Sequence, residues 1–325
     1  MKRREFISLL GGAAMAMPLA AHAQQPGRIY RLGVILPSGR QTPPIEAFFD
    51  ELRLNGFIEG RNLEVLPGGL EIRNEQMPAH AAAMVRAAPD VIISGGVFAT
   101  RAVQQVNTSV PHVATSNDMV ADGFVTSLAR PGGNTTGFSL LAPELDGKRQ
   151  DLLIEAVPGV RKLGLLADAN TTPAAHVQKL QEAARGRGIE AAAYTVTGPD
   201  GIAPAMQNAK ADGAMALNVL TSPMFGAYPN RGIVTERATA LRLPAIYEWP
   251  EMAEEGGFAA YGPRFSTFFR QYARIVVRVL RGTKPADIPV EQPTRFELVI
   301  NLKTAKAIGH EIPAGLVLRA DKLVE

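Results

Sequence analysis

The chain has 325 residues, no cysteine, and 34 basic against 31 acidic side chains, for a formal net charge of +3. The missing cysteines exclude disulfides, thiolate metal sites, cysteine nucleophiles and a lipid anchor on cysteine. Basic and acidic residues are interspersed, so the chain lacks the basic patch typical of nucleic-acid binding, and we expect no nucleic-acid partner.

The first 23 residues have the three-part pattern of a secretory signal peptide. Residues 1–7 are basic, with Arg3 and Arg4 in tandem, residues 7–21 are uncharged and mostly apolar, and Ala21-His22-Ala23 provides a small-residue cleavage site. The apolar run is too short to span a bilayer comfortably, and no later run approaches that length. We therefore expect a protein released into the periplasm by the twin-arginine or the Sec route, without direct membrane insertion.

After this segment, short apolar or β-branched runs alternate with longer segments of helical periodicity. Such a β-α-β-α rhythm predicts a parallel sheet covered by helices on both faces. In the first half of the chain we predict strands at residues 30–36, 62–66, 90–94 and 112–115, and helices at residues 45–54, 75–88 and 99–106.

The pattern begins again after residues 130–137, a loop rich in turn residues. This loop lacks the spacing of a phosphate-binding loop or a dinucleotide fingerprint, so we predict a structural role for it, just before a crossing at residues 137–141. For the second half we predict strands at residues 163–167, 189–196, 213–219, 244–247, 258–262 and 296–300, helices at 144–157, 174–187, 233–241, 266–280 and 302–308, and a short helix ending near Asp212.

The amphipathic helix at residues 266–280 is predicted to return to the first lobe. The second crossing then lies at residues 258–262 and the third at residues 285–293. The expected fold class is α/β, with two doubly wound α/β lobes joined by a three-strand hinge. Doubly wound sheets bind ligands beyond the carboxyl ends of their strands, so we expect a ligand cleft between the lobes. The predicted divisions are a signal peptide at 1–23, an N-terminal lobe at 24–138 plus 262–287, and a C-terminal lobe at 139–261 plus 288–325.

Residues 128–137 (LARPGGNTTG) resemble the LARPGGNxTG signature of the ABC transporter substrate-binding protein family that includes tryptophan- and tyrosine-type binding proteins. One position departs from the family pattern, because Asp118-Met119 stands where the family usually has Asp-Pro. The resemblance implies a type I periplasmic-binding-protein fold of the Venus-flytrap kind, delivery of a small ligand to an ABC permease in the inner membrane, and no catalysis. Further matches, in order along the chain, are residues 55–62, 89–92, 122–125, 285–293, 301–305, 312–313 and 319–321.

In the first lobe, serine, glycine and aspartate residues follow the predicted strands. Backbone amides of the glycine turn at residues 94–96 suit an anion such as an amino-acid carboxylate, although the same glycines can simply allow a tight strand-to-helix turn. Asp118 can accept the ammonium group of a ligand or cap the segment that follows it. The substrate-binding residues predicted in this lobe are Ser38, Ser94, Gly95, Gly96, Ser116 and Asp118.

In the second lobe, two carboxylate-containing segments follow predicted strands. Asp168 and Asn170 come after the strand at residues 163–167, and Tyr247-Glu248-Trp249 comes at the end of the strand at residues 244–247. An aromatic wall beside a carboxylate suits an apolar or aromatic amino acid. The other interpretation places Trp249 in packing between the lobes and Glu248 in solvent. We predict Asp168, Asn170, Tyr247 and Glu248 as substrate-binding residues, with Asp118, Asp168 or Glu248 as the ammonium partner.

The leading interpretation is a monomeric solute-binding component of an ABC importer. Its small-molecule ligand is predicted to be a hydrophobic or aromatic amino acid, or a related small acid. A periplasmic ligand-sensing module for a chemoreceptor or kinase is the alternative, and it differs only in partner. An exported enzyme is disfavoured, because the histidines are dispersed and neither a nucleophile elbow nor a dinucleotide motif occurs. We predict no catalytic residue, no metal and no cofactor.

Overall fold

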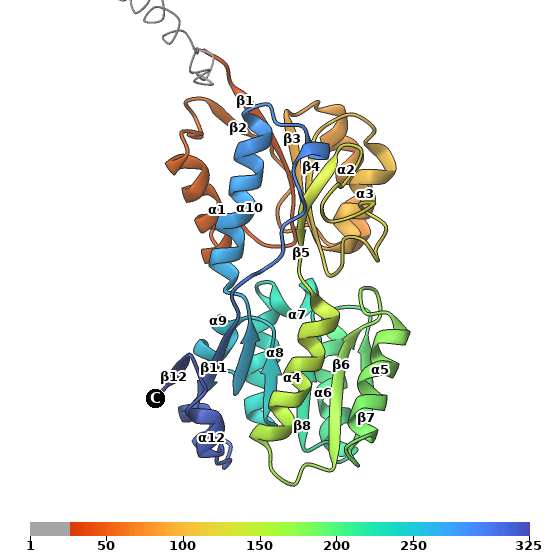
Figure 1. Cartoon of the computed structure of the whole chain (residues 1–325), viewed down its shortest axis with the longest axis vertical. Coiled ribbons are helices and arrows are strands. Elements are labelled where there is room, and N and C mark those ends of the chain that lie inside the picture. The colour runs from red at the N-terminus through yellow and green to blue at the C-terminus, as the bar shows by residue number, and fades with distance from the viewer. Residues whose placement is uncertain (1–26) are drawn as a thin grey trace, which may run out of the picture.

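The computed structural model describes residues 27–325, so the predicted signal peptide lies outside the described residues. Two open α/β sheets form separate lobes, which are stacked along the long axis of the molecule (Figure 1). Three chain segments connect them. The prediction of two α/β lobes joined by a three-strand hinge is confirmed. Within residues 27–325, no helix is both long and apolar enough to cross a membrane.

The first lobe contains a five-stranded sheet in which every neighbouring pair is parallel. Its elements are β1 (Tyr30–Ile35), α1 (Pro43–Leu54), β2 (Leu63–Val65), the 3-10 helix η1 (Asn74–Gln76), α2 (Met77–Arg86), β3 (Val91–Gly95), α3 (Val97–Val106), β4 (His112–Ser116), β5 (Thr135–Ser139), α10 (Phe265–Leu280) and the 3-10 helix η3 (Pro285–Asp287). The strand order is β2-β1-β3-β4-β5. Helix α10 packs beside α1, and α2 packs beside α3.

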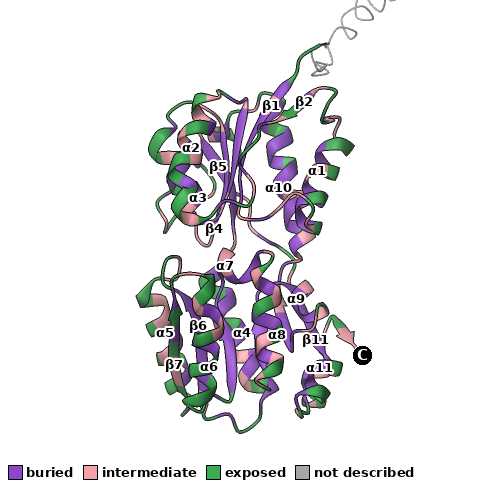
Figure 2. Cartoon of the chain, turned by 180° about the vertical axis from the view of Figure 1, so that it is seen from behind, coloured by how far each residue is buried: buried purple, intermediate pink, exposed green. Residues whose placement is uncertain are grey.

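The central strands β1 and β3 are mostly apolar on both faces, because helices cover both faces of the sheet. Side chains alternate between the faces along each strand. Leu32 and Val34 of β1 belong to the cluster that contains residues of α1 and α10. Ile35 of β1 and Ile92 of β3 belong to a second cluster with residues of α2 and α3. Figure 2 shows the result, with buried strands inside and exposed outer faces on the helices.

The second lobe contains a seven-stranded sheet and the remaining helices. Its elements are α4 (Ala142–Ala156), β6 (Lys162–Asp168), α5 (Ala174–Arg185), β7 (Glu190–Val196), the 3-10 helix η2 (Pro199–Gly201), α6 (Ile202–Ala211), β8 (Ala216–Val219), α7 (Pro223–Gly226), α8 (Asn230–Ala240), β9 (Ala245–Tyr247), α9 (Pro250–Glu254), β10 (Ala259–Gly262), β11 (Glu297–Asn301), α11 (Leu302–Ala307), α12 (Ala314–Val317) and β12 (Lys322–Val324). The strand order is β12-β11-β10-β9-β8-β6-β7.

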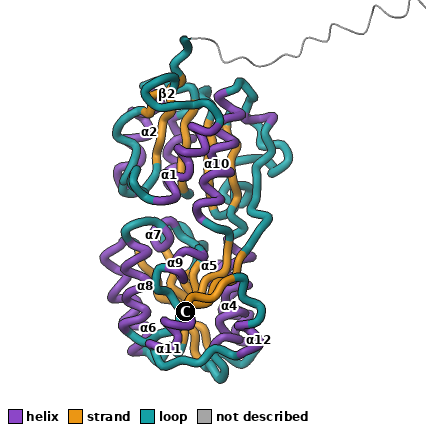
Figure 3. The backbone as a smooth tube through the Cα atoms, turned by 90° about the vertical axis from the view of Figure 1, so that its left-hand side faces the viewer, coloured by secondary structure: helices purple, strands orange, loops and turns teal. Residues whose placement is uncertain are grey.

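This second sheet is mixed, because β10 and β11 are antiparallel while the other neighbouring pairs are parallel. Strand β10 runs toward the hinge, and the chain leaves it for α10 in the first lobe. The chain later returns from the first lobe and enters β11 from the hinge side, so β11 must run in the opposite direction. The chain ends in β12, on the outer edge of this lobe (Figure 3).

The three crossings lie side by side between the lobes (Figure 1). The first joins β5 to α4, the second joins β10 to α10, and the third precedes β11. Before this third crossing, the backbone of Glu291 pairs with β5: its N–H donates to the Gly137 carbonyl at 2.9 Å, and its carbonyl accepts from the Ser139 N–H at 2.9 Å. The third segment therefore extends the first sheet before it crosses.

The largest departure from the predicted elements is β5. Its residues Thr135–Ser139 overlap the end of the predicted loop at 130–137 and the start of the predicted crossing. The two threonines pair with His112 and Val113 of β4, and Gly137 approaches so closely that a Cβ there would lie 1.8 Å from the Ala114 carbonyl oxygen. The glycine that suggested a turn therefore allows two strands to approach. Three short elements, α7, α9 and β12, were also not predicted.

Candidate functional site

The cleft between the lobes is lined by loops that follow the carboxyl ends of strands in both sheets. It contains an outer cavity of about 680 Å³ and a small inner cavity of about 60 Å³ beside the hinge. The two cavities share five lining residues, so they are parts of one space: Pro37, Gly95, Gly96, Pro223 and Ala227. This position agrees with the general rule for ligand sites in open α/β sheets.

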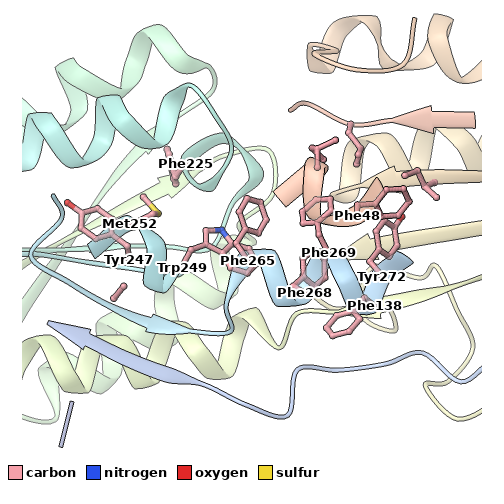
Figure 4. Close-up of a cluster of buried hydrophobic side chains, with 14 of the residues drawn as sticks. Phe48, Phe138, Phe225, Tyr247, Trp249, Met252, Phe265, Phe268, Phe269 and Tyr272 are labelled. Carbon is pink, nitrogen blue, oxygen red and sulfur yellow. The ribbon is translucent and has the colours of Figure 1, made fainter. Parts of the chain in front are cut away.

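Aromatic rings form one wall of the inner cavity. Trp249 follows β9, and Phe265, Phe268 and Phe269 lie on the first turns of α10. The Trp249 and Phe265 rings are stacked, with centroids 4.2 Å apart and an interplanar angle of 28°. Figure 4 shows these rings in a row that passes from the second lobe into the first. The row provides a flat apolar surface on which another ring can stack.

Glu248 places a carboxyl group in the same wall. The residue is only 7% exposed. Burial raises the pKa of Glu248 to about 8, because the charged form loses its hydration. The positive charge of Arg149 opposes this rise, and the negative charge of Asp146 adds to it. The energetic penalty of ionising Glu248 can be offset by a cation in the cavity, such as the ammonium group of an amino acid.

Gly226, at the end of α7, gives Glu248 and Trp249 the room that they occupy. A Cβ at this position would lie 2.1 Å from Glu248 Oε1 and 2.4 Å from Trp249 Nε1. Both distances are well inside van der Waals contact, so a larger residue would displace both groups. Glycine is therefore required here by the close approach of these groups, and this residue was not predicted from the sequence.

The glycine turn predicted at residues 94–96 lies on the opposite side of the cleft. Gly96 is the N-cap of α3 and has φ +86°, a conformation that strongly favours glycine. A Cβ on Gly96 would lie 2.7 Å from the Pro223 side chain, so the lobes touch here. Val97 and Phe98, in the first turn of α3, line the outer cavity. The N-terminus of this helix can attract a ligand carboxylate.

Two polar side chains complete the first-lobe wall. Ser38 is 5% exposed and lines the inner cavity, as predicted from its place after β1. Asn117 also lines it, and its Nδ2 group donates to the Thr221 carbonyl of the second lobe at 3.4 Å. Asn117 thus supplies an amide at the contact between lobes, whereas its predicted neighbours Ser116 and Asp118 line neither cavity.

Ser94 is fully buried beneath the glycine turn and lines neither cavity. Its hydroxyl oxygen lies 2.9 Å from Thr100 Oγ1 and 2.7 Å from Nε2 of His112, and its N–H donates to the Tyr272 hydroxyl at 3.1 Å. Burial lowers the pKa of His112 to about 3, so this imidazole is neutral. The Ser94 side chain supports the turn from below, and only Gly95 and Gly96 of the predicted trio reach the cavity.

Three further predicted residues also have local partners or core positions. Ser116 is fully buried. Asp118 Oδ1 accepts from the backbone N–H groups of Val120 and Ala121, at 3.1 and 3.0 Å, which matches the capping role considered for it. Tyr247 is fully buried in the core of the second lobe, facing away from the cleft (Figure 4). As ligand contacts, these residues remain predictions without support from their placement.

Asp168 is buried at the edge of the outer cavity, where four donors surround its carboxylate. Ser222 Oγ donates to it at 2.7 Å, Thr171 Oγ1 at 3.1 Å, and Asn170 donates through its backbone N–H at 2.9 Å and its side chain at 3.0 Å. Asp168 and Asn170 therefore join the loops after β6 and β8. Of the three carboxylates considered for a ligand ammonium, Glu248 alone lines the inner cavity.

Most of the aromatic wall and part of its polar edge were not predicted from the sequence. The periodicity of α10 predicts that Phe265, Phe268 and Phe269 are buried, but it does not distinguish a core position from a cavity wall. Thr221 follows β8 just as Glu248 follows β9, and this shared position after a strand is the signal that could have identified it. Within residues 27–325, no group of three or more His, Asp or Glu side chains could hold a metal ion.

Comparison with known proteins relates this chain to a protein family. A sequence profile of the family described as ABC transporter substrate binding protein matches residues 48–324. The chain belongs to this family. Membership of the ABC transporter substrate binding protein family implies a small-molecule ligand and an ABC transporter as partner, and such proteins usually act outside the cytoplasm. The resemblance inferred from residues 128–137 is thereby confirmed.

This substrate binding protein resembles a curated relative in sequence and two solved structures in fold. The tyrosine-binding protein of Clostridioides difficile is 24% identical over 272 residues, covering 81% of this chain and 75% of the relative. A conserved domain protein from Vibrio cholerae has a TM-score of 0.79 at 23% identity, over 91% of this chain and 99% of the other. An ABC domain in complex with L-Trp from Streptococcus pneumonia has a TM-score of 0.74 at 19% identity, over 91% and 100%.

Proposed function

We propose that this protein is the periplasmic solute-binding component of an ABC importer and that it captures an amino acid with an aromatic or other bulky apolar side chain. The observation that carries the proposal is the pairing of a buried carboxyl group, Glu248, with the stacked rings of Trp249 and Phe265 in one wall. Family membership and the names of the tyrosine-binding and L-Trp-bound relatives support it.

In this proposal each part of an amino acid meets a complementary group. The ammonium group lies against Glu248, and the side chain stacks on the aromatic wall. The carboxylate faces the glycine turn and the N-terminus of α3, with Ser38 and Asn117 as hydrogen-bond donors. Asp168 and the other predicted residues outside the inner cavity keep structural roles.

Capture follows from the two-lobed geometry. A ligand that contacts both lobes stabilises their closed arrangement, and it can shift the equilibrium only by its difference in affinity for the open and closed forms. Glu248 and Trp249 belong to the second lobe, whereas Ser38 and Gly96 belong to the first. The closed complex is then the form presented to the permease. Cleavage after Ala23 is part of the proposal, and the mass of the exported protein tests it.

Isothermal titration calorimetry at pH 8 tests the ligand class. We expect L-tryptophan, L-tyrosine or L-phenylalanine to bind, and the two halves of the zwitterion to be required together. Tryptamine lacks the carboxylate and indole-3-propionate lacks the ammonium group, so each should bind at least about tenfold more weakly than L-tryptophan, a loss of about 1.4 kcal/mol. Equal affinity for indole-3-propionate and L-tryptophan would remove Glu248 from the site.

A further inference from the structure

Arg149 on α4 has a fully buried guanidinium group. It lies behind Thr221, a residue of the inner-cavity wall. Its Nη2 group donates to Thr221 Oγ1 at 2.5 Å and to Asp146 Oδ1, and its Nη1 group donates to the Tyr261 carbonyl at 3.1 Å. Thr221 lines the inner cavity, whereas Arg149 lines neither cavity. Arg149 can therefore act on a ligand only through its neighbours.

These neighbours come from segments that adjoin the hinge. Helix α4 begins just after the first crossing, and Tyr261 lies in β10, just before the second. Thr221 provides the carbonyl that accepts from Asn117 of the first lobe. Asp146 Oδ1 also accepts from the Thr221 N–H at 3.0 Å, so Thr221 is held on both its backbone and its hydroxyl. Arg149 and Asp146 together fix the residue through which the lobes meet.

The charges around Glu248 form a small, buried set. Arg149 and Asp146 of α4 both act on Glu248, and His176 of α5 lies behind Asp146, with its Nε2 2.8 Å from Asp146 Oδ2. Burial raises the pKa of Asp146, but Arg149, His176 and Thr221 outweigh it and hold that pKa below its usual value. With Asp146 ionised, the guanidinium of Arg149 acts on two carboxyl groups, those of Asp146 and Glu248. An ammonium group in the cavity would add a positive charge on the other side of Glu248.

We propose that Arg149 is a positioning residue for ligand binding: it holds Thr221 at the contact between the lobes and places its positive charge behind the cavity wall that contains Glu248. This inference rests on the proposed function for its ligand, but its action on Glu248 is a property of the ligand-free protein. Asp146 opposes Arg149 in that action, since it is the carboxylate that competes for the same guanidinium.

The two members of the pair must then move the titration of Glu248 in opposite directions. Arg149→Met removes the positive charge and should raise the pH midpoint of Glu248 by about 1 to 3 units. Asp146→Asn removes the competing negative charge and should lower it. Arg149→Lys keeps the charge without the planar fork, so the midpoint should stay near that of the wild type while amino-acid affinity falls. A purely structural arginine would produce a loss of stability in each variant but no opposite shifts.

Carbon-13 NMR of protein labelled at glutamate carboxyl carbons measures this midpoint without a ligand, and Glu248→Gln assigns the signal. Arg319→Met is the matched control, because Arg319 pairs at 2.7 Å with Glu155, an exposed carboxylate of the same helix α4. Opposite shifts for Arg149→Met and Asp146→Asn, with no shift in the control, support the proposal. If Arg149→Met does not fold, a lowered Glu248 midpoint in Asp146→Asn together with an unchanged midpoint in Arg149→Lys still supports the proposal.

Calorimetry with L-tryptophan between pH 6 and pH 9 gives the second readout. The pH at which affinity is half-maximal should move with the NMR midpoint in each variant. An unmoved Glu248 midpoint, or a shift in the same direction for Arg149→Met and Asp146→Asn, overturns the inference. A wild-type protein that binds none of the aromatic amino acids overturns the proposed function instead, and the NMR titration then decides the control of Glu248 by Arg149 separately.

Discussion

Glu248 carries its carboxyl group in surroundings that favour the neutral form, and this has a consequence for folding. Its pKa of about 8 in the folded chain lies above the usual value of 4.5. Between these two pH values the folded protein retains a proton that the unfolded chain has released. The stabilisation from the raised pKa is therefore fully present below about pH 4.5 and is lost as the pH rises through 8.

Glu248→Gln tests this linkage in the ligand-free protein. We expect the wild-type melting temperature to fall between pH 5 and pH 8, and the variant to show a flatter profile over that range, because glutamine stays neutral. Differential scanning calorimetry measures both profiles. Glu155→Gln, at an exposed salt bridge, should keep the wild-type slope. Parallel profiles for wild type and Glu248→Gln would show that Glu248 does not titrate in this range.

At the scale of helices and strands, α10 connects the hinge to the glycine turn at residues 94–96. It enters the first lobe after the second crossing, with Phe265, Phe268 and Phe269 against the inner cavity. Two turns later its Tyr272 hydroxyl reaches between β3 and β4, where it lies 3.0 Å from the Ser94 carbonyl and 2.5 Å from the Val113 carbonyl. The helix that lines the site therefore also holds the strand that ends in the glycine turn.

Tyr272→Phe should lower stability while leaving ligand contacts in place. The substitution leaves a buried N–H and buried carbonyls without the hydroxyl, which costs about 1–3 kcal/mol. Urea unfolding measures this loss, and L-tryptophan affinity should change by less than about threefold, or 0.65 kcal/mol. Tyr194→Phe is the control, because its hydroxyl donates to Asp212 in a partly buried position, and it should cost less. Equal losses would mean that the Tyr272 contacts add nothing to stability.

Elements with strong periodicity could be predicted from the sequence, and the exceptions have a physical cause. The run at residues 30–36 and the amphipathic pattern at 266–280 correspond to β1 and α10. Strand β5 was missed because Thr135-Thr136-Gly137 follows a cluster of turn residues, and its strand character depends on pairing with β4. Elements of three to five residues, such as α7 and β12, are too short to show a period.

The candidate site was predictable in location but less so in its side chains. The rule that ligands lie beyond strand ends placed Ser38, Gly95, Gly96 and Glu248 at the cavity. It could not tell Ser116 from Asn117, because neighbouring side chains after a strand point to opposite sides, and the orientation depends on packing. For the same reason Ser94 was expected in the cleft but faces the core.

At the scale of the whole molecule, the lobes touch at the cleft as well as at the hinge. Gly96 lies against Pro223, and Asn117 donates to the Thr221 carbonyl. Both contacts lie at the cleft, beside the inner cavity. A ligand bound beside these contacts would touch both lobes and would therefore stabilise their closed arrangement.

Gly96→Ala should obstruct closure while allowing each lobe to fold. The new Cβ would press on the Pro223 side chain, and the positive φ adds strain of about 1–3 kcal/mol. Gly60→Ala is the matched control, because Gly60 has φ +78° but nothing within 4 Å of an added Cβ. Small-angle X-ray scattering with L-tryptophan should show compaction in wild type and Gly60→Ala only. Equal compaction in Gly96→Ala would show that this contact does not limit closure.

The position of Trp249, stacked on Phe265, also allows the intrinsic fluorescence of the protein to report on the candidate site. Trp249 is the single tryptophan of the sequence, it is 5% exposed, and it lies in the cavity wall next to the second crossing. All indole fluorescence of the free protein therefore originates at the candidate site, with the blue-shifted emission of a dry environment. Tyrosine or phenylalanine entering the cleft would change that emission without adding an indole of its own, so occupancy can be read without any label.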